Sequence, residues 1–134
     1  MKTLLDYNDF ITEEFKSIFQ SPSLETLENK LDKQMEKYVD LHNNIDSKSL
    51  YELRLIASLV YRISSTLHDL SKIIRNLNTQ KYDTKYDGII NSILDKCKTI
   101  LKDYKNNDRL KKYVKYKRGI EMIQLVEDSF IKIK

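Results

Sequence analysis

The chain is poor in the residues that end helices, with 2 glycines and 1 proline among its 134 residues. Because glycine and proline disfavour the interior of a helix more than any other residues, their scarcity predicts long helices joined by few turns. The single cysteine, Cys97, excludes an intramolecular disulfide. Cys97 falls in an apolar helical row beside Ile93 and Ile100, which predicts a buried thiol.

Two further absences bear on location. The sequence has no apolar run near the roughly 18 residues that a membrane-spanning helix requires. Its start, MKTLLDYNDF, carries acidic residues where a secretory signal needs an uninterrupted apolar stretch. We therefore expect a cytoplasmic protein without a membrane span.

Charge is plentiful but unevenly distributed. Charged residues make up 33% of the chain and the mean hydropathy is −0.57, so the apolar residues have to be concentrated in stripes. Residues 1–46 hold 5 Lys against 10 Asp or Glu, whereas residues 96–118 hold 10 Lys or Arg against 2 Asp. This polarity favours charge-guided assembly or contact with nucleic acid.

Apolar spacings of three and four residues predict four helices, over about 9–20, 24–42, 49–77 and 89–104. The third helix has the clearest start, because Ser49 and Glu52 fit a capping box. The segment between the last two helices, residues 78–88, is polar and is predicted to be a loop.

The C-terminal part is predicted differently. Residues 108–118 fit one or two further basic helical turns, which Gly119 ends. The stretches IEMIQLV and SFIKIK are rich in β-branched residues, and FIKIK alternates apolar and charged residues, so they favour two short strands around Glu127 and Asp128. The predicted fold is therefore all-α. Residues 1–118 form a bundle of about four helices with a long central helix, and residues 119–134 form a short β-strand pair.

The central helix is predicted to be a subunit interface. Its apolar residues cover more than one face, and a short chain supplies few neighbours to bury them. A second helical subunit would provide the missing cover, so we expect an oligomer. The predicted interface residues are Leu53, Ile56, Ala57, Val60, Ile63, Leu67, Leu70 and Ile74.

The basic segment is a candidate contact for nucleic acid. Its lysines alternate with Tyr104, Tyr113 and Tyr116, and aromatic rings among cations can stack on bases while the lysines neutralise phosphates. The alternative is a solvated helix face with half-buried tyrosines. The candidate contacts are Lys111, Lys112, Lys115, Lys117 and Arg118.

Residues for catalysis are not apparent. Arg62 and His68 resemble the Arg/His pair of HEPN ribonucleases, but six residues along a helix rotate the two side chains apart by about 240°. His42, at a helix end, is expected to interact with free carbonyl groups. The sequence shows neither a metal-ligand set nor a glycine-rich phosphate loop, so we expect a protein without cofactor, metal or catalytic site.

Three stretches together resemble a subunit of the archaeal GINS complex, an assembly factor of the replicative helicase. Residues 13–39 are similar to that family's N-terminal region, including a Ser-Pro-x-Leu-x-x-Leu step at 21–27. Residues 52–77, with Lys72-Ile73 near their end, resemble its long central helix, and residues 86–104 resemble its last core helix. The chain departs from the family in having Glu28 where a proline is frequent, and in having no arginine before Lys72.

The resemblance implies a non-catalytic scaffold that assembles with related helical subunits into a dimer of dimers. Its partners would be the MCM helicase and a RecJ-like protein, and residues 120–134 would begin a small β-rich domain. A helical protein that coats nucleic acid, including one of viral origin, and a general protein–protein adaptor are the alternatives that the sequence leaves open.

Overall fold

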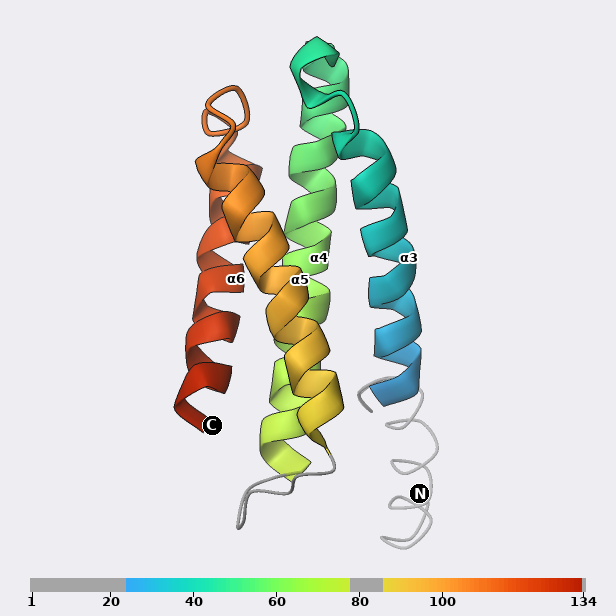
Figure 1. The fold of residues 1–134 in the computed structure, drawn as a ribbon, viewed down its shortest axis with the longest axis vertical. Coiled ribbons are helices and arrows are strands. Elements are labelled where there is room, and N and C mark those ends of the chain that lie inside the picture. Colours follow the sequence, from blue (N-terminus) through green and yellow to red (C-terminus); the bar gives the residue numbers. More distant parts are fainter. Residues whose placement is uncertain (1–23, 78–85, 134) are drawn as a thin grey trace, which may run out of the picture.

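The computed structural model describes residues 24–77 and 86–133, which form four long helices and no strand (Figure 1). These are α3 (Leu24–His42), α4 (Leu50–Leu77), α5 (Asp87–Lys105) and α6 (Val114–Ile133), with a 3-10 turn, η2 (Ile45–Ser47), before α4. The prediction of an all-helical bundle with a long central helix is confirmed. No helix in the described part is long and apolar enough to cross a membrane. The helix predicted near residues 9–20 and most of the loop predicted over 78–88 lie outside the described residues, and the end of that loop is helical, because α5 begins at Asp87.

The four helices alternate in direction along the longest axis of the molecule, so α4 and α6 run the same way (Figure 1). α4 packs along α3 on one side and along α6 on the other. α5 crosses in front of them and packs against α6. The long central helix therefore has a neighbouring helix of the same chain on each of two sides.

The start of α4 follows the predicted capping box. The Ser49 hydroxyl accepts a hydrogen bond of 3.2 Å from the Glu52 N–H, and the Ser49 N–H donates one of 3.2 Å to Glu52 Oε1. The two bonds satisfy backbone donors that the first helical turn leaves free. The preceding helix ends where Asn44 adopts a left-handed conformation, with φ of 56°.

The prediction of a C-terminal β-strand pair is wrong, since α6 is one continuous helix of 20 residues. Its buried side chains recur every three or four residues, a helical spacing that the β-branched composition concealed. Packing of this apolar face against α4 and α5 outweighs the strand preference of single residues. The buried residues are Tyr116, Ile120, Ile123, Val126 and Phe130.

Gly119 was expected to end a helix but lies inside α6, because the helices approach closely there. A Cβ atom on Gly119 would lie 3.1 Å from Val60 Cγ1 and 3.2 Å from Tyr61 Cα. A row of small residues on α4, Ala57, Ser64 and Ser71, is buried as well. Small side chains on both helices thus allow α4 and α6 to pack tightly.

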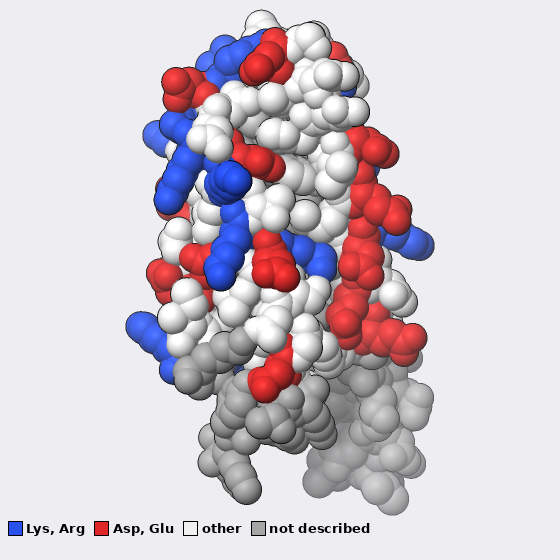
Figure 2. Space-filling model, in the orientation of Figure 1, with Lys and Arg blue, Asp and Glu red and all other residues white. Residues whose placement is uncertain are grey.

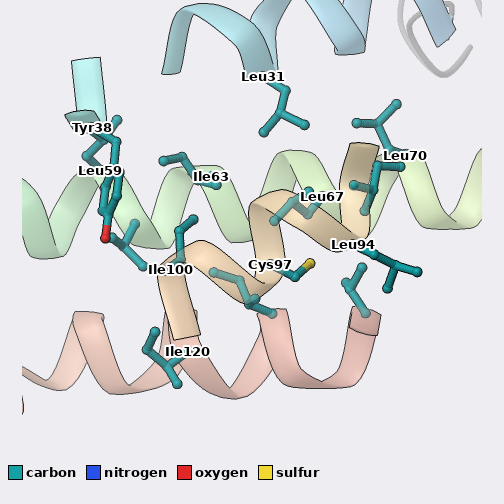
Figure 3. Packing of buried hydrophobic residues seen from close by; sticks show 14 of the residues in the cluster. Leu31, Tyr38, Leu59, Ile63, Leu67, Leu70, Leu94, Cys97, Ile100 and Ile120 are labelled. Atoms are coloured by element: carbon teal, nitrogen blue, oxygen red, sulfur yellow. The ribbon is translucent and has the colours of Figure 1, made fainter. Parts of the chain in front are cut away.

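All four helices contribute to one core (Figure 3). Leu31 of α3, Ile63 of α4, Cys97 of α5 and Ile120 of α6 are among the buried side chains labelled in this view. Cys97 is fully buried, as the sequence predicted, and burial raises the pKa of its thiol to about 12. A thiol with this pKa stays protonated and unreactive near neutral pH.

Candidate functional site

The predicted interface row is in the interior of this one chain. Seven of its eight side chains are 0% exposed and Ala57 is 2% exposed. They are covered by the chain's own helices, so another subunit cannot reach them without opening the bundle. The sequence identified the right residues for burial but underestimated how much cover α3, α5 and α6 provide. Any surface for a partner has to be sought on the outside of the helices.

The five predicted nucleic-acid contacts differ in their availability. Lys111, in the turn between α5 and α6, already has partners within the chain. Its Nζ forms an ion pair with Asp108 Oδ1 at 3.0 Å and lies 5.6 Å from the centre of the Tyr104 ring. Lys112, Lys115, Lys117 and Arg118 are exposed. Four of the five cations are therefore accessible on the surface.

Of the three tyrosines among these cations, Tyr116 is unavailable for stacking on bases. Tyr116 is 0% exposed, and its ring packs against Tyr104 with 5.2 Å between centroids. Tyr104 and Tyr113 are half-buried at the edge of the core. The sequence-based idea that rings and lysines act together on bases is thus not supported for Tyr116, which serves the core.

A surface groove follows the contact between α4 and α6, and we call it the α4–α6 groove. Its larger hollow, of about 550 Å³, is lined by residues of both helices. A second hollow of about 280 Å³ lies near the start of α6 and includes Arg54, Val114 and Lys115. The first hollow is lined among others by His68, Arg75, Leu125, Asp128, Ser129 and Lys132.

The groove arises from regular spacing on both helices. On α4, Arg54, Tyr61, His68 and Arg75 recur every seven residues and so lie on one face. On α6, the residues at 115, 118, 122, 125, 129 and 132 recur at three and four residues. Because the two helices run in the same direction, these two rows lie along the same contact, with one hollow toward each end of it.

The groove combines cations with exposed apolar side chains. The residues that line the two hollows include a single acid, Asp128, and four cations. The cations are Arg54, Arg75, Lys115 and Lys132. Leu125 is 65% exposed and Val114 is 62% exposed, although the core beside them is closed. A lone exposed leucine is unremarkable, but apolar groups placed between cations in a groove form a surface that suits an acidic, partly apolar segment.

The Arg/His pair suggested by the sequence does not converge. His68 is half-buried and lines the groove, whereas Arg62 is exposed and is not among the lining residues. The hydroxyls near His68 are engaged with backbone, since Ser71 donates to the His68 carbonyl and Ser129 to the Val126 carbonyl, at 2.7 and 3.0 Å. The described groove therefore lacks the hydrogen-bonded nucleophile and base that acid–base catalysis uses.

A second polar cluster lies between α3, α5 and α6. The Tyr38 hydroxyl donates to Asp103 Oδ2 at 2.7 Å, and His42 Nε2 lies 3.9 Å from the same oxygen. The His42 ring stacks on Tyr38, so it faces a side chain and a carboxylate and not the free helix-end carbonyls that were expected. Burial raises the pKa of Tyr38 and of the neighbouring Tyr116, which keeps both phenols neutral. This cluster fastens helices together.

Arg109 is a residue that the sequence did not single out. Its guanidinium donates to the carbonyls of Ile45, Asp46 and Lys48 at 3.3, 2.8 and 2.7 Å. These bonds tie the α5–α6 turn to the α3–α4 turn at one end of the bundle. Arginine suits this role because its planar group presents several donors in a fixed geometry.

Comparisons of the chain with protein-family models, with curated proteins and with solved structures find no match. Within the described residues, no group of three or more His, Cys, Asp or Glu side chains is placed to hold a metal ion. On the described surface, the α4–α6 groove is accordingly our candidate binding site. The seven-residue spacing of its α4 residues is visible in the sequence and could have revealed that side of the groove. Its α6 residues could not be recognised, because most of that helix was predicted to form strands.

Proposed function

We propose that the chain is a non-catalytic assembly subunit that binds a partner through the α4–α6 groove. One observation carries the proposal: Leu125 is left 65% exposed beside a core that is already closed, in a groove bordered by Arg75 and Lys132. Burial of such a side chain stabilises a complex by about 1.5–3 kcal/mol. The cations around it favour an acidic partner and speed its approach.

The more specific form of the proposal is a scaffold of a DNA replication complex. It is supported by the resemblance of residues 13–39, 52–77 and 86–104 to subunits of the archaeal GINS complex. In that case the partners are related helical subunits, the MCM helicase and a RecJ-like protein. The continuous helix α6 occupies the place where the resemblance implied the first strands of a β domain. The replication role thus rests on the helical part alone.

The experiment is an affinity capture that compares three versions of the immobilised chain. Leu125→Glu places a charge in the groove, while Ile131→Glu places the same charge on α6 at a residue that is 54% exposed and outside the groove. Purified GINS subunits, MCM helicase and RecJ-like protein are each offered at low salt. Wild type and Ile131→Glu should retain the partner and Leu125→Glu should lose it.

The replication role fails if none of these proteins is retained by the wild-type chain. The groove itself fails as a binding surface if a partner is retained equally by all three versions. Circular dichroism of each version distinguishes loss of binding from loss of fold, because every version should keep its helical signal.

Contact with nucleic acid is a second candidate function, favoured by the exposure of Lys115, Lys117 and Arg118 near the start of α6. With Tyr116 buried, such contact would go mainly to phosphates and would show little sequence preference. Fluorescence anisotropy with a labelled single-stranded oligonucleotide tests this. Affinity should fall steeply as salt rises, and the triple alanine variant of these residues should bind at least tenfold more weakly. A flat salt response would remove this candidate.

A further inference from the structure

The α4–α6 groove suits an acidic helix with an apolar edge, and the chain itself carries such a helix. Five acids of α3 recur every three or four residues and therefore share one side of that helix. Figure 2 shows acidic side chains as a column along the side of the molecule where α3 lies. We call this column the α3 stripe; its acids are Glu25, Glu28, Asp32, Glu36 and Asp40.

The α3 stripe has an apolar edge as well as charge. A shallow hollow on the stripe is lined by Met35 and Val39 together with three of the acids. Val39 is 60% exposed, although α3 buries other apolar residues in the core. Together with Met35, Val39 gives the stripe an apolar edge that packing against another helix would bury.

The acids of the stripe are weakly engaged within the described part of the chain. The one ion pair there joins Lys96 Nζ to Asp32 Oδ1 at 3.8 Å, and the Asp32 side chain is 67% exposed. An exposed pair at this distance contributes little. Most of the negative charge on α3 is thus available to cations of another molecule.

The dimensions of the two surfaces agree. From Glu25 to Asp40 the stripe is about 22 Å long, at 1.5 Å per residue, and the two hollows of the groove together extend about 31 Å along α4, from Arg54 to Arg75. The groove is therefore long enough to receive the whole stripe. Each surface has cations or acids distributed along its length, with exposed apolar side chains between them.

We propose that the α3 stripe of one copy of the chain docks in the α4–α6 groove of a second copy. This inference rests on the proposed function, in which the groove binds an acidic, partly apolar helix. In the docked pair, Glu28 and Glu36 face cations of the groove, and Val39 packs near Leu125. Charge complementarity selects this occupant, because the required acidic helix is present in every copy.

The arrangement has a consequence for assembly. The two surfaces lie on different helices of the same molecule, so a docked copy still offers a free stripe or a free groove. Contacts of this heterologous kind add further copies until a ring closes or a filament grows. The assembly should weaken with salt, because most of the charges are exposed and screened.

The test uses two variants that each remove one surface. The stripe variant is Glu28→Lys with Glu36→Lys, and the groove variant is Arg75→Glu with Lys132→Glu. Light scattering at low salt should show that the wild-type mass rises with concentration, while each variant alone is monomeric. An equimolar mixture should form a complex of one copy of each variant, because the mixture supplies one intact stripe and one intact groove.

A matched control is Lys33→Glu with Lys37→Glu, which reverses two charges on α3 outside the stripe and should assemble as wild type does. Circular dichroism verifies that every variant is folded. The inference is overturned if the wild-type chain stays monomeric at low salt, or if the two variants fail to combine although each is folded. If the wild-type chain stays monomeric but Leu125→Glu still loses a captured partner, self-docking is refuted and the proposed function stands.

Discussion

The Tyr38 hydroxyl donates a 2.7 Å hydrogen bond to Asp103 Oδ2 and so joins α3 to α5 across 65 residues of sequence. Tyr38 is 1% exposed, which leaves its hydroxyl little access to water. A buried donor that loses its partner costs about 1–3 kcal/mol. This pair therefore fixes how α5 lies on the bundle.

Asp103→Ala should lower the free energy of unfolding by about 1–3 kcal/mol, because it leaves the buried Tyr38 hydroxyl without its acceptor. Urea unfolding monitored by circular dichroism measures the change. The control is Asp95→Ala, an exposed acid on the same helix, which should change stability by no more than about 0.5 kcal/mol. In a Tyr38→Phe background the cost of Asp103→Ala should shrink; equal costs in both backgrounds would show that the two residues are not coupled.

The protein should lose stability above pH 10. Tyr38 and Tyr116 have an ordinary pKa of 10.0 when unfolded, and burial raises the pKa of both in the folded state. Below pH 10 the phenols are neutral in both states; above it the unfolded chain releases protons that the folded chain keeps. Each tyrosine should therefore reduce the free energy of unfolding by about 1.4 kcal/mol per pH unit.

Urea unfolding at pH 9, 10 and 11 tests this prediction. A variant with Tyr38→Phe and Tyr116→Phe removes both titrating groups and should show a shallower decline with pH. The same slope in wild type and variant would mean that other groups, such as the lysines, control the alkaline transition.

The two glycines should respond in opposite ways to alanine. At Gly119 a Cβ atom would press on the Tyr61 backbone at 3.2 Å, and a helix backbone cannot easily move away, so Gly119→Ala should destabilise by about 1 kcal/mol. At Gly88 nothing lies within 4 Å, so Gly88→Ala should stabilise by up to about 1 kcal/mol through helix propensity. Thermal unfolding compares the two; stabilisation by both would show that α4 and α6 are less closely packed than described.

Loss of Arg109 should loosen one end of the bundle without unfolding it. Arg109→Ala removes the donors to three carbonyls of the α3–α4 turn. Hydrogen exchange of the Ser47 and Lys48 amides should become at least tenfold faster, because their turn hydrogen bonds depend on the position of that segment. The control is Lys112→Ala. Lys112 is an exposed lysine in the same α5–α6 turn as Arg109, and its loss should leave these exchange rates unchanged.

The sequence predicted the helices of the described part well wherever the apolar spacing was long. The eight residues from Leu53 to Ile74 keep a helical period, and all are buried. The capping box at Ser49 likewise depends on residues three apart, so its local geometry could be anticipated. Both the apolar period and the capping box depend only on residues within one helix, so the sequence is enough to predict them.

The parts that failed depend on contacts between helices. Gly119 resembles a helix end in the sequence, and only the approach of Tyr61 shows why glycine is needed inside α6. The pairing of Tyr38 with Asp103 joins positions with no local relation. For the candidate site, Arg54 and Arg75 follow a visible heptad, but Leu125 and Lys132 could be assigned to the groove only once α6 was known to be a helix running beside α4.

The lone thiol of Cys97 provides a built-in reporter of conformational opening. It is sealed between α5 and its neighbours, so an alkylating reagent can reach it only after the bundle has separated. With enough reagent for labelling to outpace reclosing, the rate of labelling in the absence of denaturant gives the frequency of such openings. The native chain thus permits its kinetic stability to be followed without an introduced dye or tag.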